Sequence, residues 1–97
     1  MAWSDELAKR SDALRKVLAD DAEFIGSDSA LPRWVKLLMA MQLDSVTNHP
    51  DGARYYGTQA LEAGASEQQV MEAIQLLRMY AGRPAMATAA SMFLSRK

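Results

Sequence analysis

Few side chains in this 97-residue sequence could move a proton near neutral pH. The chain has one histidine, His49, and no cysteine, so acid–base chemistry is open to it and thiol chemistry is not. His49 stands before Pro50, in a polar segment that interrupts two apolar stretches. It is either a general acid or base, or a polar loop residue that meets solvent.

Two adjacent tyrosines, Tyr55 and Tyr56, follow the histidine. Neighbours on a helix point about 100° apart, so the two rings are not expected to share one pocket equally. One should pack in the core and the other should line a cleft, and the sequence leaves open which does which. A phenol with a pKa near 10 is a poor base at neutral pH, but it can donate a hydrogen bond to an oxyanion.

Arginines are the candidate groups for holding a substrate. Arg54 lies beside the two tyrosines, and Arg78 interrupts an otherwise apolar segment between Leu77 and Met79. Arg78 either clamps a carboxylate through two hydrogen bonds, extends outward to solvent, or pairs with a glutamate across a subunit boundary. Arg54, Arg78 and Tyr55 are therefore the predicted substrate-binding residues. Asp44, late in an apolar helix, is either a buried carboxylate that must be paired or have a perturbed pKa, or the first polar residue where that helix emerges, and we favour the second interpretation.

The other chemistry-bearing residue types form no recognisable pattern. One histidine and dispersed acids do not have the spacing of metal ligands, and the glycines occur as helix stops rather than in a phosphate loop. We therefore expect no metal and no cofactor. A net charge of −1 with interspersed charges does not favour nucleic acid, and no apolar run reaches the length of a membrane span. The first residues lack the order of a signal peptide, so a cytoplasmic protein is expected.

Residues that start and end helices divide the chain into the elements that must position these groups. Gly64 suits a left-handed helix end, Ser66 and Gln69 form a capping box, and Gly82 repeats the stop before Pro84. Apolar residues recur every three or four positions, so the fold class is all-α. About five helices are expected, over residues 5–24 (capped by Ser4), 32–46, 52–63, 67–81 and 84–94.

The apolar content exceeds what one small core can hide. Hydrophobic residues make up 49% of the chain and include seven methionines. The helix over 32–46 has apolar side chains on several sides, so we expect it to be buried all round by its own core, by a partner subunit or by both. We therefore expect a homo-oligomer, in which the subunits bury this apolar surface against one another.

Three segments carry a resemblance to a known family. They are Leu31-Pro32, the run Ala60-Leu61-Glu62-Ala63-Gly64-Ala65-Ser66, and Tyr80-Ala81-Gly82-Arg83-Pro84-Ala85 with Glu72 before it. On these residues the chain resembles the carboxymuconolactone decarboxylase family, which includes an AhpD-like branch. The resemblance covers roughly residues 31–90. It implies one domain over 1–97, with an N-terminal helix and loop in 1–30 and a family core in 31–95. It also implies a homo-trimer or homo-hexamer with active sites near helices 32–46 and 52–63.

The resemblance also indicates which of the reactions known from the two branches of the family are possible for this chain. The peroxidase branch uses Cys-x-x-Cys-x-x-x-His and a glutamate, and these positions fall at His49, Gly52, Tyr56 and Leu37. Thiol peroxidase activity is therefore excluded. In the decarboxylase branch a histidine would stand at Tyr56. The resemblance thus implies His49 and Tyr56 as catalytic residues beside a hydrophobic pocket.

Two functions from different classes follow. The first is a cofactor-free lyase-like enzyme that acts by acid–base catalysis on a small organic acid, lactone or carbonyl compound. The second is a non-catalytic oligomer of the same fold that binds a small molecule or serves in assembly. The enzyme requires His49 and Tyr56 to face one enclosed cavity with an arginine within reach. Exposure of both on open surface would contradict it.

Overall fold

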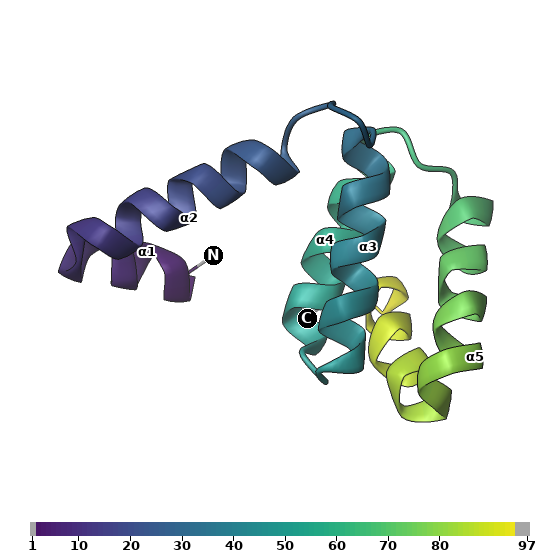
Figure 1. Cartoon of the computed structure of the whole chain (residues 1–97). Coiled ribbons are helices and arrows are strands. Elements are labelled where there is room, and N and C mark those ends of the chain that lie inside the picture. The colour runs from purple at the N-terminus through teal and green to yellow at the C-terminus, as the bar shows by residue number, and fades with distance from the viewer. Residues whose placement is uncertain (1, 95–97) are drawn as a thin grey trace.

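The fold is a helical bundle with a helical arm beside it (Figure 1). The computed structural model describes residues 2–94, and no strand occurs within them, which confirms the all-α class. Residue 95, the last of the expected family core, lies outside the described part. The elements are α1 (Ala2–Arg10), α2 (Asp12–Ile25), α3 (Arg33–Val46), α4 (Pro50–Glu62), α5 (Glu67–Ala90) and the short 3₁₀ helix η1 (Ser91–Phe93).

The N-terminal segment differs from the single helix expected over 5–24. It forms two helices that meet at Ser11, whose φ of −147° and ψ of 119° are extended. The Ser11 side chain accepts a hydrogen bond from the Leu14 amide at 3.1 Å, which makes it the N-cap of α2. Ser4, the expected cap, lies inside α1 instead. A serine hydroxyl that bonds to the local backbone competes with helix continuation, and here that competition ends α1.

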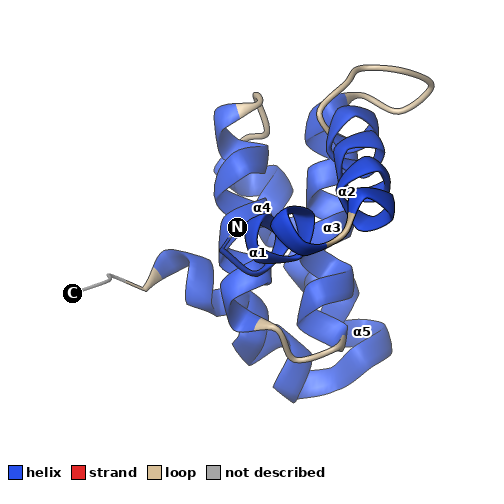
Figure 2. Ribbon diagram, turned by 90° about the vertical axis from the view of Figure 1, so that its left-hand side faces the viewer, coloured by secondary structure: helices blue, strands red, loops and turns tan. Residues whose placement is uncertain are grey.

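The helix ends and the capping box that were predicted after residue 60 are confirmed. Gly64 has a φ of 116°, and Ser66 and Gln69 form the capping box, with amide-to-side-chain bonds of 2.8 and 3.0 Å. Gly82, at φ 83° and ψ −175°, breaks the helical geometry of α5, so this element is two helical stretches joined by a kink. The chain turns there, and η1 packs against α4 (Figures 1 and 2).

Substitution of Gly82 by alanine should destabilise the protein by about 1–3 kcal/mol, because this φ/ψ region is essentially restricted to glycine. The cost is conformational rather than steric, since the atom nearest to an added Cβ would be Pro84 Cδ at 3.7 Å. Urea unfolding measures the effect, with Arg83→Ala at the adjacent exposed position as the control. Equal stability of Gly82→Ala and the wild type would contradict the strained conformation.

The hydrophobic core lies entirely within the bundle. Met41, Val70 and Leu77 are typical members, at 0%, 0% and 5% exposure, whereas α1 and α2 contain no buried residue. The single chain buries helix 32–46 on one side only, so its own core is not enough for the burial all round that was expected. Leu43 and Val46 are 66% and 54% exposed, because α3 packs against α4 and α5 on one side while the arm leaves the other side open.

One buried lysine joins the arm to the bundle. Lys36 Nζ donates to the Phe24 carbonyl oxygen at 2.6 Å and to Ser29 Oγ at 3.1 Å, and lies 4.3 Å from the centre of the Phe24 ring. Phe24 is in the last turn of α2, where a cation is favourable to the helix dipole. Lys36 therefore fixes the end of α2, and with it the loop that leads into α3.

Candidate functional site

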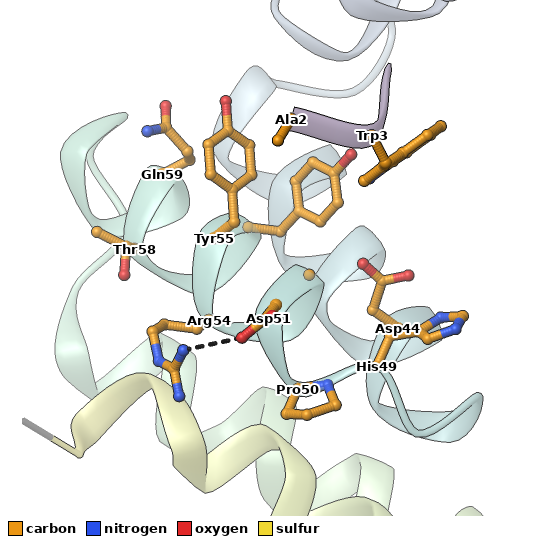
Figure 3. Close-up of a pocket in the computed structure, with 12 residues that line it drawn as sticks. Ala2, Trp3, Asp44, His49, Pro50, Asp51, Arg54, Tyr55, Thr58 and Gln59 are labelled. Atoms are coloured by element: carbon orange, nitrogen blue, oxygen red, sulfur yellow. Dashed lines mark hydrogen bonds and ion pairs between the residues drawn. The ribbon is translucent and has the colours of Figure 1, made fainter. Parts of the chain in front are cut away.

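The candidate site is a cavity of about 1020 Å³ along α4, lined by residues of that helix from Pro50 to Gln59. It is bounded by α4, by Asp44 near the end of α3, and by Ala2 and Trp3 of the arm (Figure 3). Its walls include four of the five residues that the sequence predicts for the site, namely His49, Arg54, Tyr55 and Tyr56. His49 and Tyr56 line this one cavity together with Arg54, but the cavity is open to solvent rather than enclosed.

His49 owes its place to the tight connection between α3 and α4. Its backbone amide donates to the Asp44 carbonyl oxygen at 2.8 Å, and it is the N-cap residue of α4, directly before Pro50. The preceding residue, Asn48, has a φ of 60°, and its side-chain oxygen lies 3.1 Å from the Thr88 hydroxyl, which is equally close to the Pro84 carbonyl oxygen. The segment between α3 and α4 thus contacts α3, α4 and α5. The His49 side chain itself is exposed at the cavity wall.

Asp44 lines the cavity, although the sequence favoured its interpretation as the first polar residue where the helix emerges. Its carboxylate lies over Gly52 in the first turn of α4, where a Cβ would collide with Oδ2. Figure 3 shows Asp44 and His49 next to each other at one end of the cavity. A glycine one turn into a helix, facing an acid across a short connection, is the signal that could have revealed this placement.

Burial and charge define the protonation states at this end of the cavity. Burial raises the pKa of the Asp44 carboxyl, and the positive charge of His49 acts in the opposite direction. Burial also raises the pKa of the Tyr56 phenol, and the Asp44 charge adds to the effect. Tyr56 therefore stays protonated at neutral pH and serves as a hydrogen-bond donor rather than a base.

Replacing Asp44 by asparagine should increase stability at pH 7. The folded-state pKa lies above the ordinary 3.8, so ionisation of Asp44 costs folding free energy as the pH rises through that folded pKa. The neutral isostere removes this cost, and its advantage should vanish below the unfolded-state pKa. Urea unfolding at pH 7 and near pH 3 tests the prediction, with exposed Asp20→Asn as control. A less stable Asp44→Asn at pH 7 would show that the carboxylate is stabilising.

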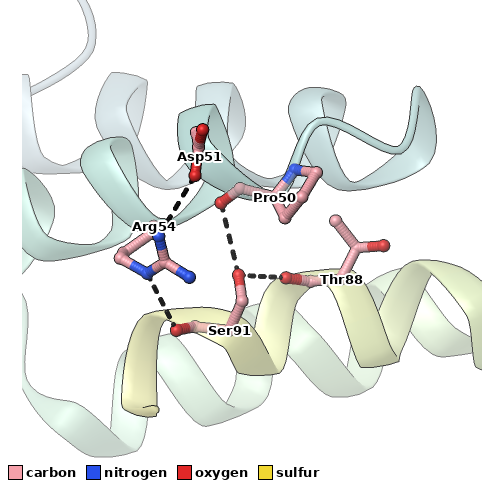
Figure 4. A network of polar contacts seen from close by, with 5 residues as sticks. All are labelled: Pro50, Asp51, Arg54, Thr88 and Ser91. Carbon is pink, nitrogen blue, oxygen red and sulfur yellow. Dashed lines mark hydrogen bonds and ion pairs between the residues drawn. The ribbon is translucent and has the colours of Figure 1, made fainter. Parts of the chain in front are cut away.

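Arg54 is already engaged in the fold. Its Nε donates to the Ser91 carbonyl oxygen at 3.2 Å, and Nη1 donates to Asp51 at 3.2 Å (Figure 4). The Ser91 hydroxyl in turn contacts the carbonyl oxygens of Thr88 at 2.6 Å and Pro50 at 3.3 Å. Arg54 thus ties η1 to α4, and Nη2 is the guanidinium nitrogen without a partner among the described residues. A substrate anion would have to use that nitrogen.

The two tyrosines both line the cavity, but they do so unequally. Tyr55 and Tyr56 meet edge to face, with ring centroids 5.2 Å apart and an interplanar angle of 79°. Both line the cavity because it extends around the side of α4, which accommodates side chains about 100° apart. Tyr56 also packs against the core, while Tyr55 is 45% exposed. Arg78, by contrast, is exposed on α5 and does not line the cavity.

A second cavity of about 750 Å³ adjoins the first, between the arm and α3. The two share Trp3, Tyr55, Tyr56 and Gln59 as lining residues. The second is walled mainly by apolar side chains of α2 and α3, among them Leu18, Phe24, Met39 and Leu43. A molecule at Tyr56 would therefore have polar groups on one side of it and an apolar space on the other.

Two further structural features bear on chemistry and environment. Within residues 2–94, no three histidine, aspartate or glutamate side chains gather in a way that could hold a metal ion. Over the same residues, no helix combines the length and the apolarity needed to cross a bilayer.

The fold and the site together describe a small all-α domain with an imidazole and a phenol on one cavity. The model of the carboxymuconolactone decarboxylase family matches residues 11–94, which is most of the chain, and the protein belongs to that family. No curated protein and no solved structure matches the chain significantly. Membership of the family thus agrees with the resemblance found in the sequence segments 31–32, 60–66 and 80–85.

Proposed function

We propose that this protein is a cofactor-free, lyase-like enzyme that acts on a small organic acid, lactone or related carbonyl compound by acid–base catalysis. The observation that carries the proposal is the shared cavity of His49 and Tyr56. An imidazole can exchange a proton near pH 7, and a neutral phenol can donate a hydrogen bond to developing oxyanion charge. The absence of cysteine from the sequence rules out the thiol-dependent peroxidase chemistry of the AhpD-like branch.

The proposed chemistry assigns one step to each group. The His49 imidazole removes a proton from the carbon next to a substrate carbonyl, and the electron pair moves into the carbonyl to give an enolate. The Tyr56 hydroxyl donates a hydrogen bond to the enolate oxygen. In a decarboxylation the C–C bond to the carboxylate breaks instead and CO₂ leaves. The electron pair of the broken bond forms the enolate, and the His49 imidazolium then protonates the carbon. Nη2 of Arg54 is the group available for a substrate carboxylate.

The assembly we propose for this enzyme is a homo-trimer or homo-hexamer. Large apolar side chains stay exposed in the single chain, including Phe24 at 65%, Leu43 at 66% and Met79 at 63%. Exposed apolar surface of this extent is typical of interfaces. Light scattering coupled to size-exclusion chromatography tests the assembly, and a monomer at micromolar concentration would contradict it.

A screen in deuterated water tests the enzymatic proposal. Purified protein is incubated with a panel of small lactones, β-keto acids and unsaturated acids, and NMR follows deuterium incorporation at the carbon next to the carbonyl and loss of the carboxylate. The expected result is a protein-dependent rate for at least one class, abolished by heat denaturation.

A non-catalytic binding protein is the second candidate, and two observations favour it. The His49 side chain is exposed, and Arg54 is largely engaged by Ser91 and Asp51. For this candidate the same NMR panel shows line broadening of bound compounds without deuterium incorporation or carboxylate loss. The screen therefore separates the two functions directly.

A further inference from the structure

The connection between α3 and α4 places a hydroxyl beside the only imidazole of the chain. Thr47 is the C-cap residue of α3, and its Oγ1 lies 3.2 Å from His49 Nδ1. The same Oγ1 lies 3.1 Å from the Leu43 carbonyl oxygen and 3.3 Å from that of Asp44. Three potential partners therefore surround one hydroxyl group.

The Thr47 hydroxyl has only one hydrogen, so it can donate to only one of these three neighbours. A threonine hydroxyl has one hydrogen and two lone pairs, and a carbonyl oxygen can only accept. When the hydroxyl hydrogen points to a carbonyl one turn back, as threonine commonly does in helices, a lone pair of Oγ1 faces Nδ1. The contact to the ring is then a hydrogen bond only if Nδ1 carries a hydrogen. The opposite arrangement, in which the hydroxyl donates to Nδ1, gives up both carbonyl contacts.

We propose that Thr47 is a positioning residue that holds His49 in the Nδ1–H tautomer and leaves the Nε2 lone pair to accept the substrate proton. The inference rests on the proposed function, because only an acid–base role gives the free nitrogen a task. Nε2 has no hydrogen-bond partner among the described residues, and His49 lines the cavity.

The same contact serves both halves of the proton transfer. In the imidazolium both nitrogens carry hydrogens, so Nδ1–H continues to donate to Thr47 after Nε2 has taken up the proton. The ring need not turn over between the two states. The Asp44 carboxylate is close enough to interact with the imidazolium charge. Thr47 thereby fixes the orientation of the ring, and Asp44 balances the charge that the ring acquires.

The tautomer can be measured directly, because the chain has a single histidine. With ¹⁵N-labelled histidine, the two ring nitrogens give one pair of signals, and at alkaline pH their shifts show which nitrogen carries the hydrogen. We expect Nδ1 to be the protonated nitrogen in the full chain. Thr47→Val removes the acceptor and should shift the tautomer ratio about fivefold toward Nε2–H, the size that a hydrogen bond of ordinary net strength supports. Thr47→Ser keeps the hydroxyl and should keep the ratio.

A predominant Nε2–H tautomer in the wild type would overturn the proposal, and this measurement needs no variant to fold. An unchanged ratio in a folded Thr47→Val would overturn it equally. Turnover is a separate readout. If the wild type shows the Nδ1–H tautomer but no reaction in the substrate screen, the proposed function fails while the tautomer assignment stands. With an active substrate, Thr47→Val should lower kcat and leave KM nearly unchanged.

Discussion

Replacing His49 by alanine is expected to lower turnover by about 10²–10⁴-fold, the usual contribution of a positioned general acid or base. The loss should be in kcat rather than in KM, because the imidazole takes part in proton transfer and the walls of the cavity bind the substrate. The rate of deuterium incorporation or of CO₂ release, for the best compound of the screen, measures it. Since His49 is exposed, its loss should leave the unfolding midpoint almost unchanged.

Thr58 offers a matched control for this experiment. It lines the same cavity from α4, and its side chain is also exposed, but it carries no group that titrates near neutral pH. Thr58→Ala should therefore retain turnover within a few-fold. Wild-type turnover in His49→Ala would assign proton transfer to another group of the cavity, of which Asp44 is the nearest candidate.

The helix boundaries that the sequence predicts correctly are those determined by local backbone chemistry. Gly64 and Gly82 adopt positive φ, and Ser66 pairs with Gln69, because each of these needs only a few neighbouring residues. The break at Ser11 is also local, but the sequence pattern does not predict it. Apolar residues continue at helical spacing through it, from Leu7 to Leu14, and this periodicity predicts one continuous helix.

The site was predictable where its members share one helix. Arg54, Tyr55 and Tyr56 share α4, which the sequence predicts over 52–63. His49 is the N-cap residue before this helix, in a segment expected to be a loop, and only the family resemblance grouped it with Tyr56. Asp44 comes from α3, and its position over Gly52 depends on how sharply the chain turns between the two helices. The engagement of Arg54 depends on the return of η1 after the kink at Gly82, which no local pattern specifies.

Met41 offers the largest expected effect on stability. Its side chain is fully buried, at 0% exposure, on the face of α3 that packs against α4. A Cβ on Gly57 of α4 would lie 3.5 Å from Met41 Cγ, which shows how closely the two helices approach there. Met41→Ala should leave a cavity that this close packing cannot refill, and should cost about 2–5 kcal/mol. Urea unfolding measures it.

Met39, two residues earlier on the same helix, is the matched control, because it is the same residue type at 46% exposure. In an isolated chain Met39→Ala should cost well under half of the Met41 value, since its atoms are already partly in water. If α3 instead packs against a partner subunit, the Met39 cost should rise with protein concentration while the Met41 cost stays constant. A small effect at both positions would contradict the packing of α3 on α4. A concentration-dependent effect at Met39 alone would locate the subunit interface on the open side of α3.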